Sequence, residues 1–226
     1  IGTDEQPGVM RTFLDALSLR NAAWQNMPDC DVTLDFVGHS MGTLVGSRLL
    51  REYPDLEFDR IVFMAAASSI EDFVTTVPQY LKRHPEAQFF SLGLSNIDEG
   101  NELTLLSSVF PRGSLLVWVD NFFEPILSPE DYRLGDFWNS PVSRVPASTK
   151  AKECERMRLI KVAGARSDRD GWPRKHGDFN ETEYLGQLLD LTADGLEGMP
   201  TTSELAERCG ISCAIFSPCS KPLLYD

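Results

Sequence analysis

Apolar residues recur along the chain with two alternating spacings, one typical of amphipathic helices and the other of short buried strands. The predicted strands are the apolar runs at residues 32–37, 60–67, 88–94 and 156–163. Helical spacing of apolar side chains predicts helices at about 9–26, 41–53, 70–81, 114–123 and 184–189. This alternation predicts an α/β fold, with a mostly parallel sheet and helices on both of its faces.

Local signals set the expected ends of two of these helices. Pro54 should end the 41–53 helix, because the residue before a proline avoids helical geometry. Ser68 or Ser69 should cap the next helix, since a carboxylate follows three positions later in either case. Pro78 lies inside that helical pattern, so the helix is expected to be kinked or shorter than the pattern.

At one strand-to-helix junction, residues 32–47, VTLDFVGHSMGTLVGS, a glycine lies two places before a serine and another two places after it. Such a junction leaves its apex residue strained and crowded at the carboxyl edge of the sheet. Gly38 and Gly42 would remove colliding side chains, so Ser40 should stand at the apex with its hydroxyl exposed. The Met41 N–H, at the helix N-terminus, should donate to an oxyanion, and Gly46 should let the helix approach the sheet closely.

The segment GHSMG, between VTLDFV and TLVGSRLLREYP, resembles the nucleophile elbow of the α/β-hydrolase family, in its lipase- and esterase-like branch. The next segment, FDRIVFMAAA, is similar to the family's following strand, and the order of elements agrees from about residue 32 to 190. The resemblance implies a serine hydrolase whose serine, acid and histidine follow one another in that order along the chain. Ser40 would then be the nucleophile.

A serine hydroxyl needs a general base, and the chain contains three histidines from which to choose it. His39 directly precedes Ser40 and cannot fold back onto its neighbour. His84 lies just before the third predicted strand, at the opposite edge of the sheet. His176 follows the fourth strand at the correct edge and agrees with the family's order, so we expect it to be the base.

The acid that orients the base should lie on a loop that leaves a strand at the same edge of the sheet. The family resemblance implies the loop after the third strand, SNIDEGNE, where Asp98 is the expected acid. Glu99 and Glu102 of the same loop remain open as alternatives. Asp72, after the second strand, and Asp120, in the fourth predicted helix, are also open.

Charge and cysteine usage restrict the partners. The formal net charge of −13 disfavours nucleic acids and anionic membrane surfaces. No apolar run approaches the ~20 residues that a membrane-spanning helix needs. No spacing of the five cysteines matches a zinc site, and we expect neither a cofactor nor a metal. Asp168 and Asp170 should shape their loop, and the alternative is that they bind a cation.

A single α/β-hydrolase domain is expected to span residues 1–226, with a C-terminal tail at 199–226. The irregular stretch 124–156 should either cover the site as a lid or pack as ordinary core. The family has several strands before its elbow, whereas 31 residues precede Val32 here. The elbow strand would then be an exposed edge, so we expect an N-terminal segment or a partner chain to complete the sheet.

The expected activity is hydrolysis of a carboxylic ester of a small molecule or a lipid, through an acyl-enzyme intermediate. Ser40 would attack the acyl carbon, His176 would transfer the proton and Asp98 would hold His176. A thioesterase, an amidase or an acyltransferase on the same scaffold is an alternative, because a fold does not determine its substrate. A non-catalytic hydrolase-like binding domain is the other alternative, and the sequence leaves the cellular compartment undecided.

Overall fold

The computed structural model describes residues 8–25, 33–94, 96–102, 113–120, 126–128, 131–135, 156–162, 173–181 and 223–225. Its elements in chain order are α1 Val9–Gln25, β1 Asp35–His39, α2 Gly42–Glu52, β2 Arg60–Met64, α3 Ile70–Arg83, β3 Gln88–Leu94, α4 Asn96–Asn101, α5 Leu115–Trp118, β4 Met157–Val162, the 3₁₀ turn η3 His176–Asn180, and β5 Leu223–Tyr225. The helix predicted at 184–189 lies outside the described residues, as does the predicted tail apart from β5.

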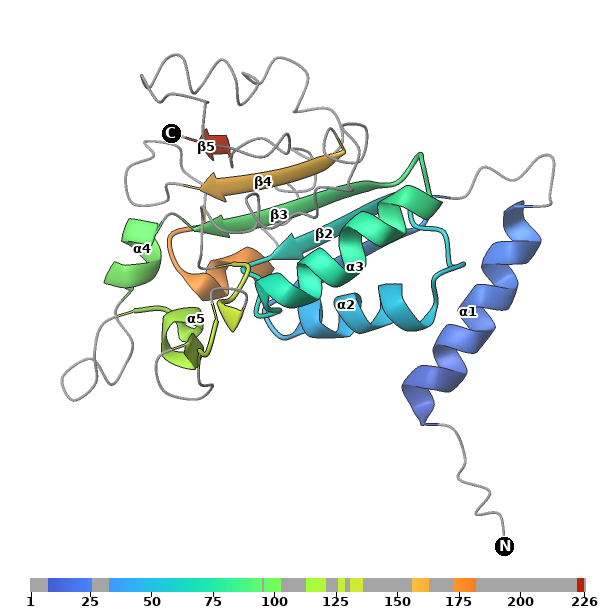
Figure 1. Ribbon diagram of the computed structural model, residues 1–226, viewed down its shortest axis with the longest axis horizontal. Helices are drawn as coiled ribbons and strands as arrows, with labels where there is room; N and C mark the ends of the chain where they lie inside the picture. Colours follow the sequence, from blue (N-terminus) through green and yellow to red (C-terminus); the bar gives the residue numbers. More distant parts are fainter. Residues whose placement is uncertain are drawn as a thin grey trace, which may run out of the picture.

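The strands form one five-stranded sheet in the order β1-β2-β3-β4-β5, and all neighbouring strands are parallel. This arrangement confirms the predicted α/β fold. Strand β5 was not predicted, because three residues are too few for a hydrophobic period to be recognised. Since the strands are parallel, their carboxyl ends share one edge, and Figure 1 shows α4, α5 and η3 gathered at that edge.

Both faces of the sheet bury apolar side chains. Helices α2 and α3 pack on one face, where Phe63 and Phe89 belong to the same core cluster as side chains of both helices (Figure 1). On the opposite face, Met64 and Leu92 cluster with Phe179 of η3. The η3 turn is therefore anchored in the core beside the carboxyl ends of the strands.

Helix α2 approaches the sheet closely at Gly46. A Cβ atom at this position would lie 2.5 Å from Cε1 of Phe36 and 2.8 Å from Cε1 of Phe63. Both distances are far below van der Waals contact, so only glycine fits without displacing an aromatic ring. The predicted role of Gly46 is confirmed, since it lets α2 lie close to β1 and β2.

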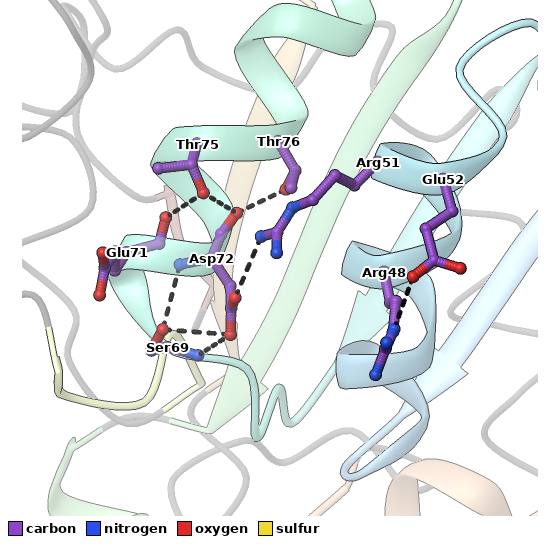
Figure 2. A network of polar contacts seen from close by, with 8 residues as sticks. All are labelled: Arg48, Arg51, Glu52, Ser69, Glu71, Asp72, Thr75 and Thr76. Atoms are coloured by element: carbon purple, nitrogen blue, oxygen red, sulfur yellow. Dashed lines mark hydrogen bonds and ion pairs between the residues drawn. The ribbon is translucent and has the colours of Figure 1, made fainter.

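The N-terminus of α3 begins with the second of the two predicted caps. The Asp72 N–H donates to Ser69 Oγ at 3.0 Å, and the Asp72 carboxylate accepts from the Ser69 N–H at 3.4 Å (Figure 2). Arg51 of α2 lies 3.5 Å from the same carboxylate and so connects the two helices. Reciprocal capping of this kind satisfies main-chain donors that the first helical turn leaves free.

The bounds of two strands and one helix differ from the predicted bounds. Strand β1 begins at Asp35, three residues later than expected, and continues through His39 to the elbow. Strand β2 ends at Met64, because Ala65 has a φ of 44°, which is incompatible with a strand. Helix α3 continues through Pro78 to Arg83 and is therefore not shortened by the proline.

Candidate active site

Ser40 forms the turn between β1 and α2 with a φ of 52°, a left-handed conformation that residues other than glycine rarely adopt. A Cβ atom at Gly38 would lie 3.0 Å from the carbonyl oxygen of Gly42 and 3.0 Å from Cε1 of Phe36, so this glycine does relieve crowding. At Gly42 itself, apart from its chain neighbours and the backbone of its own helix, no heavy atom of the described residues lies within 4 Å of an added Cβ. The expectation that Gly42 also relieves crowding is therefore wrong.

The strained conformation of Ser40 is stabilised by hydrogen bonds to its main chain. The Ser40 N–H donates to the Met64 carbonyl at 2.9 Å. The Ser40 carbonyl accepts from the Thr43 N–H at 3.0 Å, from the Thr43 hydroxyl at 2.7 Å and from the Ala67 N–H at 3.3 Å. The Thr43 hydroxyl also accepts from the Ser68 N–H at 3.0 Å, which ties the elbow to the segment after β2. Strain of this kind persists where the surroundings over-determine it.

His176, the first residue of η3, brings its imidazole to this apex. Its Nε2 lies 3.0 Å from Ser40 Oγ, and the residue is only 6% exposed. The proximity expected between the predicted nucleophile and the predicted base is thus present. In the neutral imidazole, Nε2 accepts the hydroxyl proton only when Nδ1 carries the ring hydrogen.

Glu102 is a carboxylate in contact with His176. The His176 main-chain N–H donates to Glu102 Oε2 at 2.9 Å. Nδ1 of His176 is buried without a hydrogen-bond partner among the described residues, so the bond expected between Asp98 and this nitrogen is absent. Asp98 lies in the first turn of α4, buried, at the end of the helix that favours negative charge, whereas Glu102 follows the last residue of that helix.

Burial controls the protonation of both groups. Burial, with a smaller effect from the nearby His39 ring, lowers the pKa of His176 to about 4. Burial also raises the pKa of Glu102, an effect opposed by the hydrogen bond from His176 and increased by the charge of Asp178. The imidazole is therefore neutral near pH 7, able to accept a proton, and its cation is disfavoured until a negative group approaches.

Two of the remaining carboxylates that were considered for the acid, Asp72 and Asp120, have other roles. Asp72 caps α3, as described above. Asp120 forms a buried ion pair with Arg133, with 3.0 Å between Oδ1 and Nε, and accepts the Arg133 N–H at 3.2 Å. Glu99 lies in α4 and is fully buried. None of these carboxylates accepts a hydrogen bond from Nδ1 of His176.

The predicted oxyanion donor, Met41, lies at the N-cap of α2. Its N–H makes no hydrogen bond within the described part of the chain. The end of the helix to which it belongs attracts negative charge through its free N–H groups and its dipole. This N–H is therefore available to an oxygen that becomes negative next to Ser40.

Residues 131–135, the best-described part of the 124–156 stretch, pack against the segment that joins β2 to α3. The Tyr132 carbonyl accepts from the Ile70 N–H at 2.9 Å, and the Leu134 N–H donates to the Ser68 carbonyl at 2.8 Å. Leu134 is buried in the main core cluster. This part of the stretch is thus ordinary core packing, while the aromatic pair at 137 and 138 lies outside the described residues.

The described segments contain neither a metal-binding cluster nor a membrane-spanning helix. In these segments, no group of three or more His, Cys, Asp or Glu side chains is arranged to hold a metal ion. Asp168 and Asp170 lie outside them. No helix in the described ranges is long and apolar enough to cross a bilayer.

Two contacts of His176 could not be found from sequence. Glu102 was weighed only as an alternative acid, and His39 only as a residue that cannot be the base. His39 Nε2 lies 3.1 Å from the carbonyl oxygen of His176, and the two ring centroids are 5.2 Å apart. These contacts join residues 74 and 137 positions apart, so no local pattern in the chain signals them.

Comparison with protein-family models, with curated proteins and with solved structures found no match for this chain.

Proposed function

We propose that this protein is a serine hydrolase of the α/β-hydrolase type and that it cleaves carboxylic esters. The 3.0 Å contact between Ser40 Oγ and His176 Nε2 carries the proposal. It joins a hydroxyl on a strained strand-to-helix turn to a buried, neutral imidazole, which is the pairing that activates a serine nucleophile. The position of Ser40 at the N-terminus of α2 supports the same reading.

The chemistry follows from these positions. Ser40 Oγ attacks the acyl carbon while His176 Nε2 takes its proton, and the carbonyl oxygen becomes an oxyanion that the Met41 N–H stabilises. His176 then gives the proton to the leaving alcohol, which leaves Ser40 acylated. Water attacks the acyl-enzyme with His176 again acting as base, and the acid and the free serine are released.

The acid role in this proposal belongs to Glu102. Proton transfer to Nε2 creates an imidazolium whose Nδ1–H needs an acceptor, and this nitrogen has none among the described residues in the resting site. Glu102 is the carboxylate that already accepts the main-chain N–H of the same residue. A carboxylate that is adjacent to the base stabilises the cation most when water is excluded, as it is here by burial.

The outer edge of β1 supports a proposal about a partner. Within the described residues β1 is an edge strand, and Val37 in its middle is 39% exposed. We propose that a further strand, from an N-terminal segment or a partner chain, pairs along this edge. Intact mass of the native material should reveal the additional polypeptide. A monomeric, soluble and active preparation of the 226 residues alone contradicts this part of the proposal.

A fluorophosphonate probe tests the enzymatic function, because it phosphonylates an activated serine. We expect labelling of the wild type at Ser40, no labelling of Ser40→Ala, and unchanged labelling of Ser47→Ala. Ser47 is a matched control, since it is a buried serine on the adjacent helix α2. Folded wild-type protein that resists the probe would instead indicate a non-catalytic binding domain.

Substrate class is tested separately, with nitrophenyl esters of increasing chain length and with matching thioesters and anilides. We expect the esters to turn over fastest and Ser40→Ala to be inactive on all of them. A preference for thioesters or anilides, or acyl transfer to an added alcohol, would move the assignment to the corresponding alternative on the same scaffold.

A further inference from the structure

His39 contacts the turn that carries the base through a hydrogen bond and through its ring. Its Nε2 lies 3.1 Å from the carbonyl oxygen of His176. A carbonyl oxygen only accepts hydrogen bonds, so Nε2 of His39 must carry the hydrogen and donate it. The His39 ring also stacks on Phe179, with 6.5 Å between centroids and an interplanar angle of 25°. Both contacts are made from the last residue of β1, directly before the nucleophile.

The main chain of His176 is thereby held on both sides. His39 donates to its carbonyl, and Glu102 accepts from its N–H. The imidazole itself bonds to Ser40 through Nε2, while Nδ1 has no partner in the described part of the chain. In the resting site, the position of the ring therefore depends on the main chain that carries it.

We propose that His39 is a positioning residue, which holds the turn of the base against the elbow through its hydrogen bond to the His176 carbonyl. The inference rests on the proposed function for its effect on catalysis. Because His39 and Ser40 are adjacent in the chain, their two bonds to one residue connect the nucleophile and the base as a unit. Losing the His39 donor frees the base to move relative to Ser40 Oγ, and a small misplacement of reacting groups is costly in rate.

The same juxtaposition has an electrostatic consequence. Among the described residues, the titratable groups in contact with His176 are His39 from β1 and Glu102 from the segment after α4. Lys175 and Asp178, from the same turn as His176, influence the pKa of Glu102. The His39 ring opposes protonation of the base electrostatically, as a smaller cause than burial of the lowered pKa of His176. Removing this ring should raise the pKa of His176.

Three variants separate the hydrogen bond from the charge. His39→Gln keeps an N–H donor and removes the titratable ring, whereas His39→Phe keeps the stacked ring and removes both donor and charge. His39→Leu is a second donor-free variant if the phenylalanine variant does not fold. His84→Phe is the matched control, because His84 Nε2 also lies within hydrogen-bond distance of a main-chain carbonyl, that of Pro54 at 2.7 Å, but at the end of α3 away from the site.

The first readout is the rate of fluorophosphonate labelling at a pH where His176 is neutral. We expect His39→Phe to label about threefold to tenfold more slowly than wild type, the range that corresponds to one lost hydrogen bond. His39→Gln and His84→Phe should label within about twofold of wild type. Labelling of His39→Phe at the wild-type rate overturns the proposal, and so does equal slowing of the Gln and Phe variants.

The second readout does not depend on catalysis. Titration of ¹³C-labelled histidine side chains by NMR is tractable because the chain has three histidines. The pKa of His176 should rise in both His39 variants and stay unchanged in His84→Phe. An unchanged pKa in the His39 variants overturns the electrostatic part of the inference, even if the wild type is an active hydrolase. A wild type that does not react with the probe removes the proposed function, while this titration still tests the contact.

Discussion

Acidification should destabilise this protein through His176, whose pKa is about 4 in the folded state and 6.5 without the fold. Below pH 6.5 the His176 imidazole becomes protonated in the unfolded chain, whereas in the folded protein it stays neutral until about pH 4. The unfolded state therefore binds more protons in this window, and stability falls as the pH is lowered through it. The difference between 6.5 and about 4, at ~1.4 kcal/mol for each pH unit, corresponds to about 3 kcal/mol when complete.

Urea unfolding of wild type and of His176→Gln measures this contribution. Between about pH 7.5 and about pH 4.5, the wild type should lose roughly 2 to 3 kcal/mol more unfolding free energy than the variant. The comparison with the variant is needed because carboxylates, Glu102 among them, titrate in the same range in both proteins. NMR titration of the His176 ring gives the same pKa independently.

Equal pH dependence in the two proteins would refute the argument from burial. A wild type that becomes more stable than the variant on acidification has the opposite sign, which means a pKa above 6.5. That outcome would show that a carboxylate accepts from Nδ1 of His176 in solution, unlike the arrangement described here.

Further predictions concern the acid, the elbow and the buried ion pair. Glu102→Gln should slow fluorophosphonate labelling at least tenfold and Asp98→Asn less than about twofold; the reverse order would restore Asp98 as the acid. Gly46→Ala should lower the unfolding free energy by roughly 1 to 3 kcal/mol, because its Cβ would lie 2.5 Å from an aromatic carbon, whereas Gly42→Ala should not destabilise. Equal melting temperatures for the two glycine variants would contradict the close approach. Arg133→Met should cost about 3 to 5 kcal/mol in urea unfolding, because it removes the cation from a buried aspartate; a loss below about 1 kcal/mol would show that this pair is dispensable.

Local patterns were sufficient for the features whose causes are local. The strand and helix periods indicated an α/β fold, and the cap at Ser69 with Asp72 three residues later formed as expected. The Gly-His-Ser-Met-Gly segment indicated a strained apex, which Ser40 adopts with a positive φ. Such features depend on sterics and hydrogen bonds between residues a few positions apart, so the order of the residues already contains them.

Strand ends and the use of individual glycines depended on contacts between elements. Ala65 ends β2 early, although its apolar run continues for three residues in the sequence. Gly38 and Gly46 are required by rings and backbone that the fold brings close, whereas Gly42 is not, although the motif places Gly38 and Gly42 symmetrically about Ser40. Packing distances of this kind are set by neighbouring elements and not by the local sequence.

By itself, the sequence determined the fold class, the apex serine and the edge of the sheet at which a histidine would meet it. Only the tertiary structure decided which carboxylate touches that histidine. Asp98 lies in the first turn of a short helix, α4, whereas Glu102, four positions further along the same segment, accepts the main-chain N–H of His176. The contact of His39 with His176 was decided in the same way. The Glu102 and His39 contacts both depend on how the η3 turn packs into the core, and this turn is 74 residues from Glu102 and 137 from His39. Contacts across such separations are selected by the burial of apolar residues such as Phe179, which no local pattern can specify.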